Sequence, residues 1–197
     1  MSEEVCSTER IAGAQFNLSV MSDDFKEIIL GALAEVDTAN VWKDTDDVST
    51  CVRGKPVHVF DVVKAIYLHA AKTGEHVEMS GTFSIGCPGD SSGDTYMDRG
   101  DTPANEDNAS SVSQKAGCKF ALYPLNTGNY MDVIYEQIDL SKEQNVTVTP
   151  SHYATRLDGE VNDIFRALQN AFIKVQNVVS HTTMTFTISA NSPSSKQ

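Results

Sequence analysis

The chain contains two copies of one unit. Residues 76–88 and 181–193 both combine Thr, Phe, Ile and Met over more than eight positions, both end in a proline, and they lie 105 residues apart. Such segments are typical of strands that finish a unit. Further matches follow at offsets of 105 or 104: Phe60 with Phe165, Phe16 with Phe120, and Leu18 with Leu122. Matches in the same order at a nearly constant offset indicate a duplication, which constrains the fold before any single motif does.

The first copy begins with a strand and a helix. Residues 14–20 alternate apolar and polar side chains, which is the period of a half-buried strand. Ser22 can cap the helix that follows, and the apolar residues from Phe25 to Val36 recur at helical spacing. We therefore expect this helix to pack on a sheet by one face.

A hairpin and a second helix follow. Residues 40–43 and 48–53 are short strand candidates on either side of a polar, turn-prone cluster. Pro56 suits the first position of a helix, whose apolar face runs from Phe60 and which Gly74 ends. The segment 76–88 then completes the unit as its last strand.

The second copy repeats this order. The sequence predicts a strand at 118–123, a helix at 129–142, a hairpin region at 146–156, a helix capped by Asp158 with apolar positions to Val175, and the closing strand from His181. Strand, helix, strand, strand, helix, strand is the ferredoxin-like pattern, in which helices cover one face of an antiparallel sheet.

The predicted fold is therefore α+β, with two ferredoxin-like units in tandem at 1–88 and 116–197. A long connecting loop at 89–115, rich in Gly, Ser and acidic residues, separates them. A loop of this length in a compact protein is either disordered or used in packing or binding, and the sequence leaves both readings open.

Composition excludes several classes of function. The 197 residues carry 15 Lys and Arg against 27 Asp and Glu, a formal charge of -12, so phosphate backbones would be repelled and nucleic acid is not an expected partner. No apolar run of about eighteen residues predicts membrane insertion. The acidic N-terminus does not resemble a signal peptide, so we expect a cytoplasmic protein with reduced thiols at its four cysteines.

No catalytic constellation is visible in the sequence. The five histidines show no metal-ligand spacing, no Cys-x-x-Cys occurs, and neither a nucleophile elbow nor a nucleotide fingerprint is present. We therefore expect no metal and no cofactor.

The sheet faces that the helices leave uncovered must be buried against something. We expect Ser49 or Thr50 of the first half, and His152 or Tyr153 of the second, to lie on these faces. Such a mixture suits a small polar heterocycle between apolar walls. The alternative, that they are ordinary strand residues, remains open on the sequence alone.

Longer stretches of the sequence resemble a known family. The similarity runs through nearly the whole chain, and its most specific part is the unbroken stretch from Gly81 to Asp90. The other segments that carry it are Arg10-Ile11-Ala12-Gly13, Val41-Trp42, Ser49-Thr50, Phe60-Asp61, Lys64 to Ala71, Gly93-Asp94-Thr95-Tyr96, Phe120 to Pro124, His152-Tyr153-Ala154, Leu157-Asp158-Gly159 and Ser189 to Pro193. These residues are similar to those of the YkoF-type thiamin/hydroxymethylpyrimidine-binding proteins of bacteria.

The resemblance implies a homodimer of tandem ferredoxin-like chains that binds a pyrimidine in both halves. It also implies a role in supplying the thiamin precursor to or through a membrane transporter. It carries over Leu18, Ser49 and Thr50 as first-site residues, and Leu122 with His152 or Tyr153 as second-site residues. Because the two halves differ at these positions, we expect unequal affinities.

Two other classes stay open. A small dimeric α+β enzyme acting on a heterocycle would need an acid, base or metal cluster facing its pocket, and a pure interaction domain would have no enclosed polar pocket. The sequence does not distinguish thiamin from the free pyrimidine as the ligand, nor does it identify the transporter.

Overall fold

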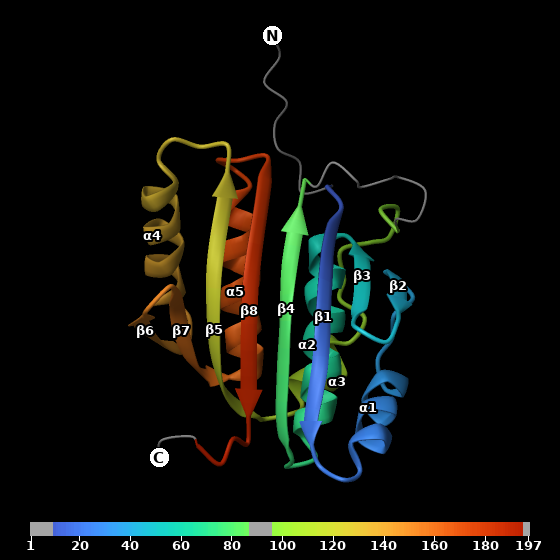
Figure 1. Ribbon diagram of the computed structural model, residues 1–197. Helices are drawn as coiled ribbons and strands as arrows, with labels where there is room; N and C mark the ends of the chain where they lie inside the picture. The colour runs from blue at the N-terminus through green and yellow to red at the C-terminus, as the bar shows by residue number, and fades with distance from the viewer. Residues whose placement is uncertain (1–9, 87–95, 195–197) are drawn as a thin grey trace.

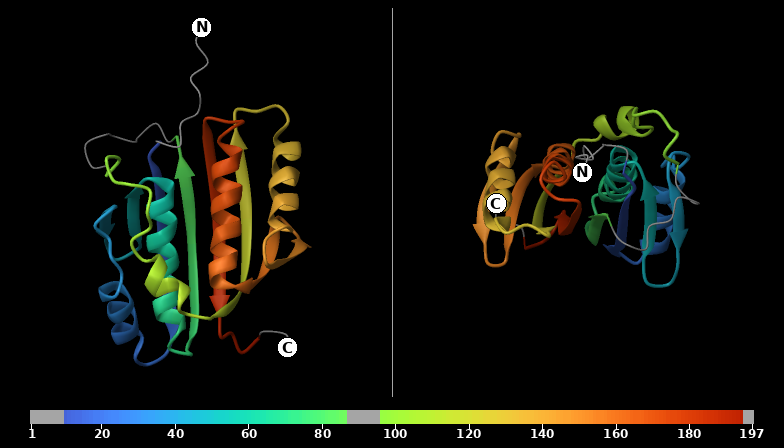
Figure 2. Two further views of the ribbon diagram at one scale, coloured as in Figure 1. Left: turned by 180° about the vertical axis from the view of Figure 1, so that it is seen from behind. Right: turned by 90° about the horizontal axis from the view of Figure 1, so that it is seen from above.

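The computed structural model describes residues 10–86 and 96–194, and these form one eight-stranded antiparallel sheet with the helices on one face (Figure 1). The strand order is β2-β3-β1-β4-β8-β5-β7-β6. Seen from above, the helices lie on one side of the sheet and the other side is uncovered (Figure 2). The architecture is therefore two layers, and only one sheet face is covered by helices.

Each half has the element order that the sequence predicts. The first half comprises β1 (Ala12–Met21), α1 (Phe25–Ala34), β2 (Trp42–Thr45), β3 (Thr50–Gly54), α2 (Pro56–Ala71) and β4 (His76–Ile85). The second comprises β5 (Lys115–Leu125), α4 (Tyr130–Ser141), β6 (Val146–Ser151), β7 (Ala154–Glu160), α5 (Val161–Val175) and β8 (His181–Ala190). The predicted α+β class with two ferredoxin-like units is confirmed. Phe60 and Phe165 are each the fifth residue of their helix, as a duplication requires.

The two units join edge to edge, which the sequence did not predict. Strands β4 and β8 pair antiparallel from Val77 opposite Ala190 to Ile85 opposite Thr182. Each unit therefore covers an edge strand that would otherwise be exposed in the other. Because backbone groups make this join, it leaves one whole sheet face uncovered.

The core runs without a break across the join. The ring of Phe60 on α2 stacks on that of Phe83 on β4, with centroids 4.0 Å apart. Phe172 on α5 approaches both rings, at 5.6 and 6.1 Å, and Phe83 stacks on Phe186 of β8 at 4.9 Å. Aromatic side chains from both halves thus share one apolar layer between the sheet and the helices.

Two predicted helix caps are wrong, whereas Pro56 does occupy the first position of α2. Helix α1 begins after Asp24, and Ser22 accepts a hydrogen bond from the Asp24 backbone N–H at 3.3 Å. Helix α5 begins after Glu160, because β7 continues past Asp158 to pair with β5. The Asp158 carboxylate accepts two hydrogen bonds from the Arg156 guanidinium instead, at 2.8 and 2.7 Å.

The connection between the halves packs against α2 and contains a short helix, α3 (Glu106–Ser110). His58 Nε2 lies 2.6 Å from the Gly100 carbonyl oxygen, and Lys64 pairs with Glu106 at 2.6 Å. Helix α2 is consequently buried at every residue except Val57, although the sequence predicts one buried face. The described part of the predicted loop is therefore used in packing, and residues 87–95 lie outside the described residues.

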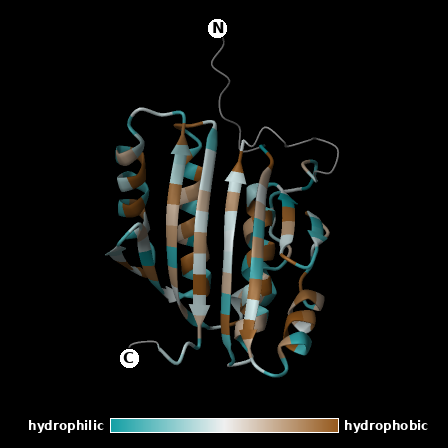
Figure 3. Ribbon diagram, viewed as in Figure 1, coloured by the Kyte–Doolittle hydropathy of each residue, from teal (hydrophilic) through white to brown (hydrophobic). Residues whose placement is uncertain are grey.

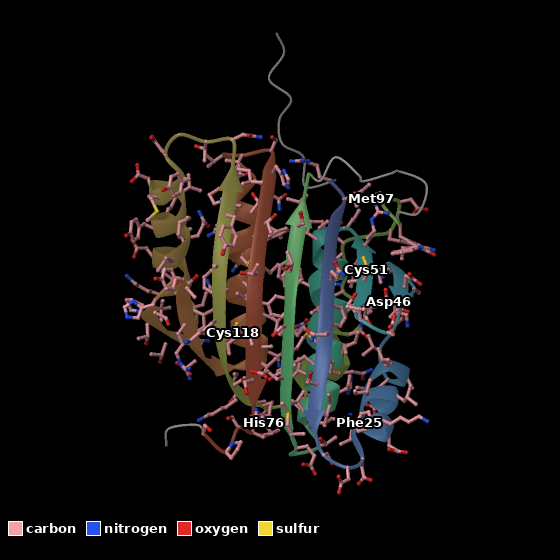
Figure 4. All side chains as sticks on the ribbon, in the orientation of Figure 1. Phe25, Asp46, Cys51, His76, Met97 and Cys118 are labelled. Atoms are coloured by element: carbon pink, nitrogen blue, oxygen red, sulfur yellow. The ribbon has the colours of Figure 1, made fainter. Side chains whose placement is uncertain are left out.

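No helix in the described part of the chain is long and apolar enough to cross a membrane. Cys51 on β3 and Cys118 on β5 lie in different halves and form no disulfide with each other (Figure 4). Burial raises the pKa of the Cys118 thiol, which keeps it protonated and unreactive. Cys6 and Cys87 lie outside the described residues.

Candidate functional site

The uncovered sheet face carries two hollows, one in each half, on either side of β8. The first is a hollow of about 450 Å³ and the second of about 200 Å³. Both are lined by Thr185, Phe186 and Thr187 of β8. The other lining residues of the first are Gln15, Phe16, Asn17, Val48, Ser49, Ser80, Gly81 and Thr82, and those of the second are Lys119, Phe120, Ala121, Tyr123, Tyr153 and Ala154.

Strand alternation positions the polar floor of the first hollow. Hydrophobic and hydrophilic residues alternate along β1 (Figure 3), and the hydrophilic ones point away from the helices. Cross-strand pairing then sets these side chains in two rows, Gln15–Thr82–Thr185 and Asn17–Ser80–Thr187. The hydroxyls of Ser80 and Thr187 lie 3.0 Å apart, so one side-chain hydrogen bond of the floor spans the join between the halves.

The turn between β2 and β3 supplies one wall. The Asp46 carboxylate accepts hydrogen bonds from the backbone N–H groups of Val48 and Ser49, each at 2.8 Å. These bonds lower the pKa of Asp46 and fix the turn, which Figure 4 locates by Asp46 and Cys51. Ser49 Oγ in turn accepts a hydrogen bond from Gln15 Nε2 at 2.9 Å, so wall and floor are linked.

The second hollow is built by the equivalent elements with different side chains. Lys119 lies opposite Thr187 as Gln15 lies opposite Thr82, so Lys119 replaces Gln15. Tyr153 stands in the turn between β6 and β7, in left-handed backbone conformation with φ 63°, and its side chain is fully exposed. The ring of His152 is its neighbour, with centroids 6.4 Å apart.

The structure separates two of the predicted first-site residues. Ser49 lines the first hollow, whereas Thr50 lies opposite Phe16 on the helix-covered side and is 9% exposed. Of the two residues expected for the uncovered face, Ser49 lies there and Thr50 does not, because successive strand residues point to opposite faces. Its hydroxyl is 3.1 Å from that of Thr45.

Leu18 and Leu122 also point to the helix-covered side, at equivalent places in the two halves. Leu18 pairs with Met79, and Leu122 pairs with Met184, both of which are fully buried. Each leucine lies two residues beyond the last pair between its strand and the hairpin. Of the predicted second-site residues, Tyr153 lines the second hollow and His152 lies beside it in the turn.

Sequence reasoning missed most of the first hollow. Gln15, Asn17, Ser80, Thr82 and Thr187 are polar strand residues with no motif of their own. The signal that could have found them is the alternation in β1, whose exposed polar positions lie on the uncovered face. Its use as a site depends on which strands become neighbours, and that depends on the join between β4 and β8.

The first hollow can bind but offers little for acid or base catalysis. The polar side chains among its described lining residues are amides and hydroxyls, which donate and accept hydrogen bonds without titrating near neutral pH. The described residues contain no group of three or more His, Cys, Asp and Glu side chains arranged to hold a metal ion. This arrangement suits recognition of a neutral polar edge.

Comparisons with known proteins agree with the duplication. The model of the YKOF-related family matches the chain twice, at residues 11–90 and 115–195. A protein of Bacillus subtilis strain 168, named "Putative HMP/thiamine-binding protein YkoF", is 50% identical over 194 residues, which is 98% of this chain and 97% of that protein.

Solved structures align with part of the chain. A hypothetical protein of Methanocaldococcus jannascii is 21% identical with a TM-score of 0.38, covering 43% of this chain and 86% of its own. A domain of unknown function from Bacillus cereus is 18% identical with a TM-score of 0.36, covering 39% of this chain and 75% of its own. The two family-model matches and the near full-length relative show that the chain belongs to the YKOF-related family.

Proposed function

We propose that this protein binds thiamin or its hydroxymethylpyrimidine precursor in the first hollow and releases it unchanged. The observation that carries the proposal is a hollow of about 450 Å³ walled by amides and hydroxyls, in a chain whose half-identical relative is named for binding these compounds. The volume falls within the roughly 300–1,000 Å³ of small-molecule sites.

The chemistry of the hollow matches a pyrimidine. An aminopyrimidine presents an exocyclic amino donor and ring nitrogens that accept hydrogen bonds. The side-chain amides of Gln15 and Asn17 can do both, and Ser49 offers a hydroxyl from the wall. The rings of Phe16 and Phe186 are 3% exposed and lie in the core on the helix-covered side, so Val48 of the turn is the exposed apolar side chain available to the ring among the lining residues. A chain of formal charge -12 also tolerates the cationic thiazolium of thiamin.

The two halves are proposed to bind with different affinities. The second hollow, at about 200 Å³, is less than half the volume of the first and has Lys119 and Ala121 where the first has Gln15 and Asn17. Each of these changes removes a side-chain amide that could pair with the ring edge. We place the tighter pyrimidine site in the first half.

The proposed biological unit is a cytoplasmic homodimer that serves uptake or supply of the thiamin precursor, in functional connection with a membrane transporter. The uncovered face supports the dimer, because the helices leave that whole side of the sheet without cover. We place the boundaries of the two units at 1–88 and 116–197.

The position of the ligand is tested with two single substitutions on neighbouring residues, read by calorimetry with thiamin and with hydroxymethylpyrimidine. Ser49→Ala removes a hydroxyl from the uncovered side, and Thr50→Val removes one from the helix-covered side while keeping the shape. If the ligand occupies the first hollow, Ser49→Ala weakens binding by several-fold to about ten-fold, as expected for one lost hydrogen bond of about 1 kcal/mol. Thr50→Val then leaves affinity nearly unchanged.

If Thr50→Val weakens binding and Ser49→Ala does not, the ligand lies on the helix-covered side beside Leu18 and Thr50. Mass spectrometry of the ligand after incubation decides between a binder and an enzyme. Recovery of unaltered ligand supports the proposal, and a converted product would assign the protein to the class of small α+β enzymes.

A further inference from the structure

The second hollow differs from the first in charge as well as in size. Its floor contains Lys119, and Arg156 of β7 lies directly opposite Lys119 on the same sheet face. The equivalent pair in the first half is Gln15 opposite Cys51. The duplication has therefore placed two cations where the other copy has an amide and a thiol.

Only one of these two cations is neutralised. The Arg156 guanidinium donates two hydrogen bonds to the Asp158 carboxylate, which raises the pKa of Arg156 and satisfies its charge. Lys119 makes no hydrogen bond or ion pair within the described part of the chain and is exposed. Lys119 is therefore a cation without a counterion among the described residues, and this favours a bound anion.

The other groups around the hollow can contribute to holding an anion. Tyr123, Tyr153, Thr185 and Thr187 line it, and each carries a hydroxyl that can donate a hydrogen bond. Asp158 is already paired with Arg156, so the local sum of Lys119, Arg156 and Asp158 is positive. This sign contrasts with the formal charge of -12 of the whole chain.

We propose that the second hollow binds a phosphate group, on inorganic phosphate or on a phosphorylated form of the pyrimidine ligand, through Lys119. The proposal rests on the proposed function for the identity of the ester, but the phosphate contact depends only on Lys119 and the hydroxyls around it. A primary amine and several hydroxyl donors on one concave surface are the groups that recognise a phosphate monoester. The two halves then discriminate a phosphorylated ligand from an unphosphorylated one.

The experiment compares two probes that differ only in the phosphate, hydroxymethylpyrimidine and hydroxymethylpyrimidine phosphate, with inorganic phosphate as a third. Calorimetry on the full chain is carried out with wild type, Lys119→Gln and Lys174→Gln. The first variant installs the amide that the first half has at this position. The second removes one positive charge from the exposed side of α5, on the other side of the sheet.

We expect wild type to bind hydroxymethylpyrimidine phosphate at one site more tightly than hydroxymethylpyrimidine, with an affinity that falls as salt is raised. Lys119→Gln should weaken this site about ten-fold or more, the usual loss for one hydrogen bond to a charged group, and Lys174→Gln should leave it unchanged. If inorganic phosphate binds as tightly as the ester and with the same dependence on Lys119, the site recognises the phosphate alone.

Equal affinities of wild type and Lys119→Gln for the ester, or equal weakening by both variants, would overturn the proposal. If the protein does not bind the pyrimidine at all, the calorimetry gives a different pattern. Unphosphorylated hydroxymethylpyrimidine would then not bind in any variant, while the effect of Lys119→Gln on phosphate would remain.

Discussion

Gly81 of β4 lies directly opposite Phe186 of β8, and the two occupy equivalent positions in the two repeats, 105 residues apart. Their pair therefore lies where a two-fold axis relating the halves would pass. A Cβ atom added to Gly81 would be 3.0 Å from Phe186 Cε1 and 2.7 Å from both the Gln15 carbonyl oxygen and Phe16 Cβ. A large side chain from one strand and a glycine from the other fit at this central position, whereas two large side chains would not.

Gly81→Ala should therefore destabilise the join between the halves. The new methyl must displace backbone and the Phe186 ring, and overpacking of this kind costs roughly 1–3 kcal/mol. Urea unfolding should show a lower midpoint. Gly31→Ala is the matched control, because a Cβ on this exposed residue of α1 meets no atom within 4 Å. That variant should be neutral or more stable by about 0.5–1 kcal/mol. Equal effects of the two changes would contradict the packing argument.

Asn105→Ala should release the connecting segment from α2. The Asn105 side chain accepts a hydrogen bond from the Asp37 N–H at 2.7 Å and donates to the Asp37 carbonyl and to Asp61 Oδ2, at 2.9 and 2.8 Å. Because Asp61 is buried, removing a donor leaves its carboxylate less satisfied, and we expect a loss of about 2–4 kcal/mol of unfolding free energy.

The control is Asn108→Ala, three residues on, where the side chain is exposed and changes of stability should stay within about 0.5 kcal/mol. Limited proteolysis provides a second measurement. Cleavage within residues 96–114 should be faster in Asn105→Ala than in Asn108→Ala, and equal rates would show that the asparagine does not fasten the segment.

Much of the fold could be predicted because two of its signals can be read directly along the sequence. Apolar residues at strand or helix spacing give the elements, and recurrence at 105 residues gives the two units. The join between β4 and β8 could not be predicted, because any exposed strand edge offers the same backbone groups to a partner. Asp158 looked like a helix cap, but its carboxylate pairs with Arg156 while β7 continues to Glu160.

The candidate site was predictable only in part, for a reason of geometry. Ser49 and Thr50 are adjacent in the sequence, but strand geometry directs them to opposite faces. The second half shows the same limit. Comparison with the repeat aligns Thr50 with Thr155, not with Tyr153, since Thr155 lies opposite Phe120 as Thr50 lies opposite Phe16. The alignment of Thr50 with Tyr153 is therefore two residues out, and it moves the expected second-site residue from β7 into the turn between β6 and β7.

A homodimer that forms through the uncovered face should be broken by a charge placed there. Ser84 lies opposite Gly13 and Thr183 on that face and outside both hollows. Light scattering at micromolar concentration should give about twice the chain mass for wild type and a single chain mass for Ser84→Arg, since closed two-fold pairing is the commonest assembly and a buried unpaired charge opposes it. Ser110→Arg, on the exposed connecting segment, should remain dimeric. A monomeric wild type would refute the proposed assembly.

The stability of the protein should fall as the pH drops below neutrality, through His69. This side chain is 6% exposed, and its Nδ1 lies 2.9 Å from both Lys72 Nζ and Glu35 Oε2. Burial and the Lys72 ammonium lower the pKa of His69 below its ordinary 6.5, against the opposing effect of Glu35. The unfolded chain therefore takes up a proton at a higher pH than the folded chain does. The contribution of His69 to the free energy of unfolding is fully present above about pH 6.5. It is lost as the pH falls toward the pKa of His69 in the folded protein.

Glu35 acts in a separate window. Its hydrogen bond from Lys72 lowers its pKa from 4.5, so its contribution is lost only as the pH falls below that value. Urea midpoints measured between about pH 7.5 and pH 5.5 thus separate the contribution of His69 from that of Glu35. The urea midpoint of His69→Gln should change less with pH over this range than that of wild type. The midpoint of His152→Gln, in the exposed turn between β6 and β7, should change with pH as it does in wild type. If both variants keep the slope of wild type, the pH dependence arises from another group, and the buried contact of His69 with Lys72 does not control it.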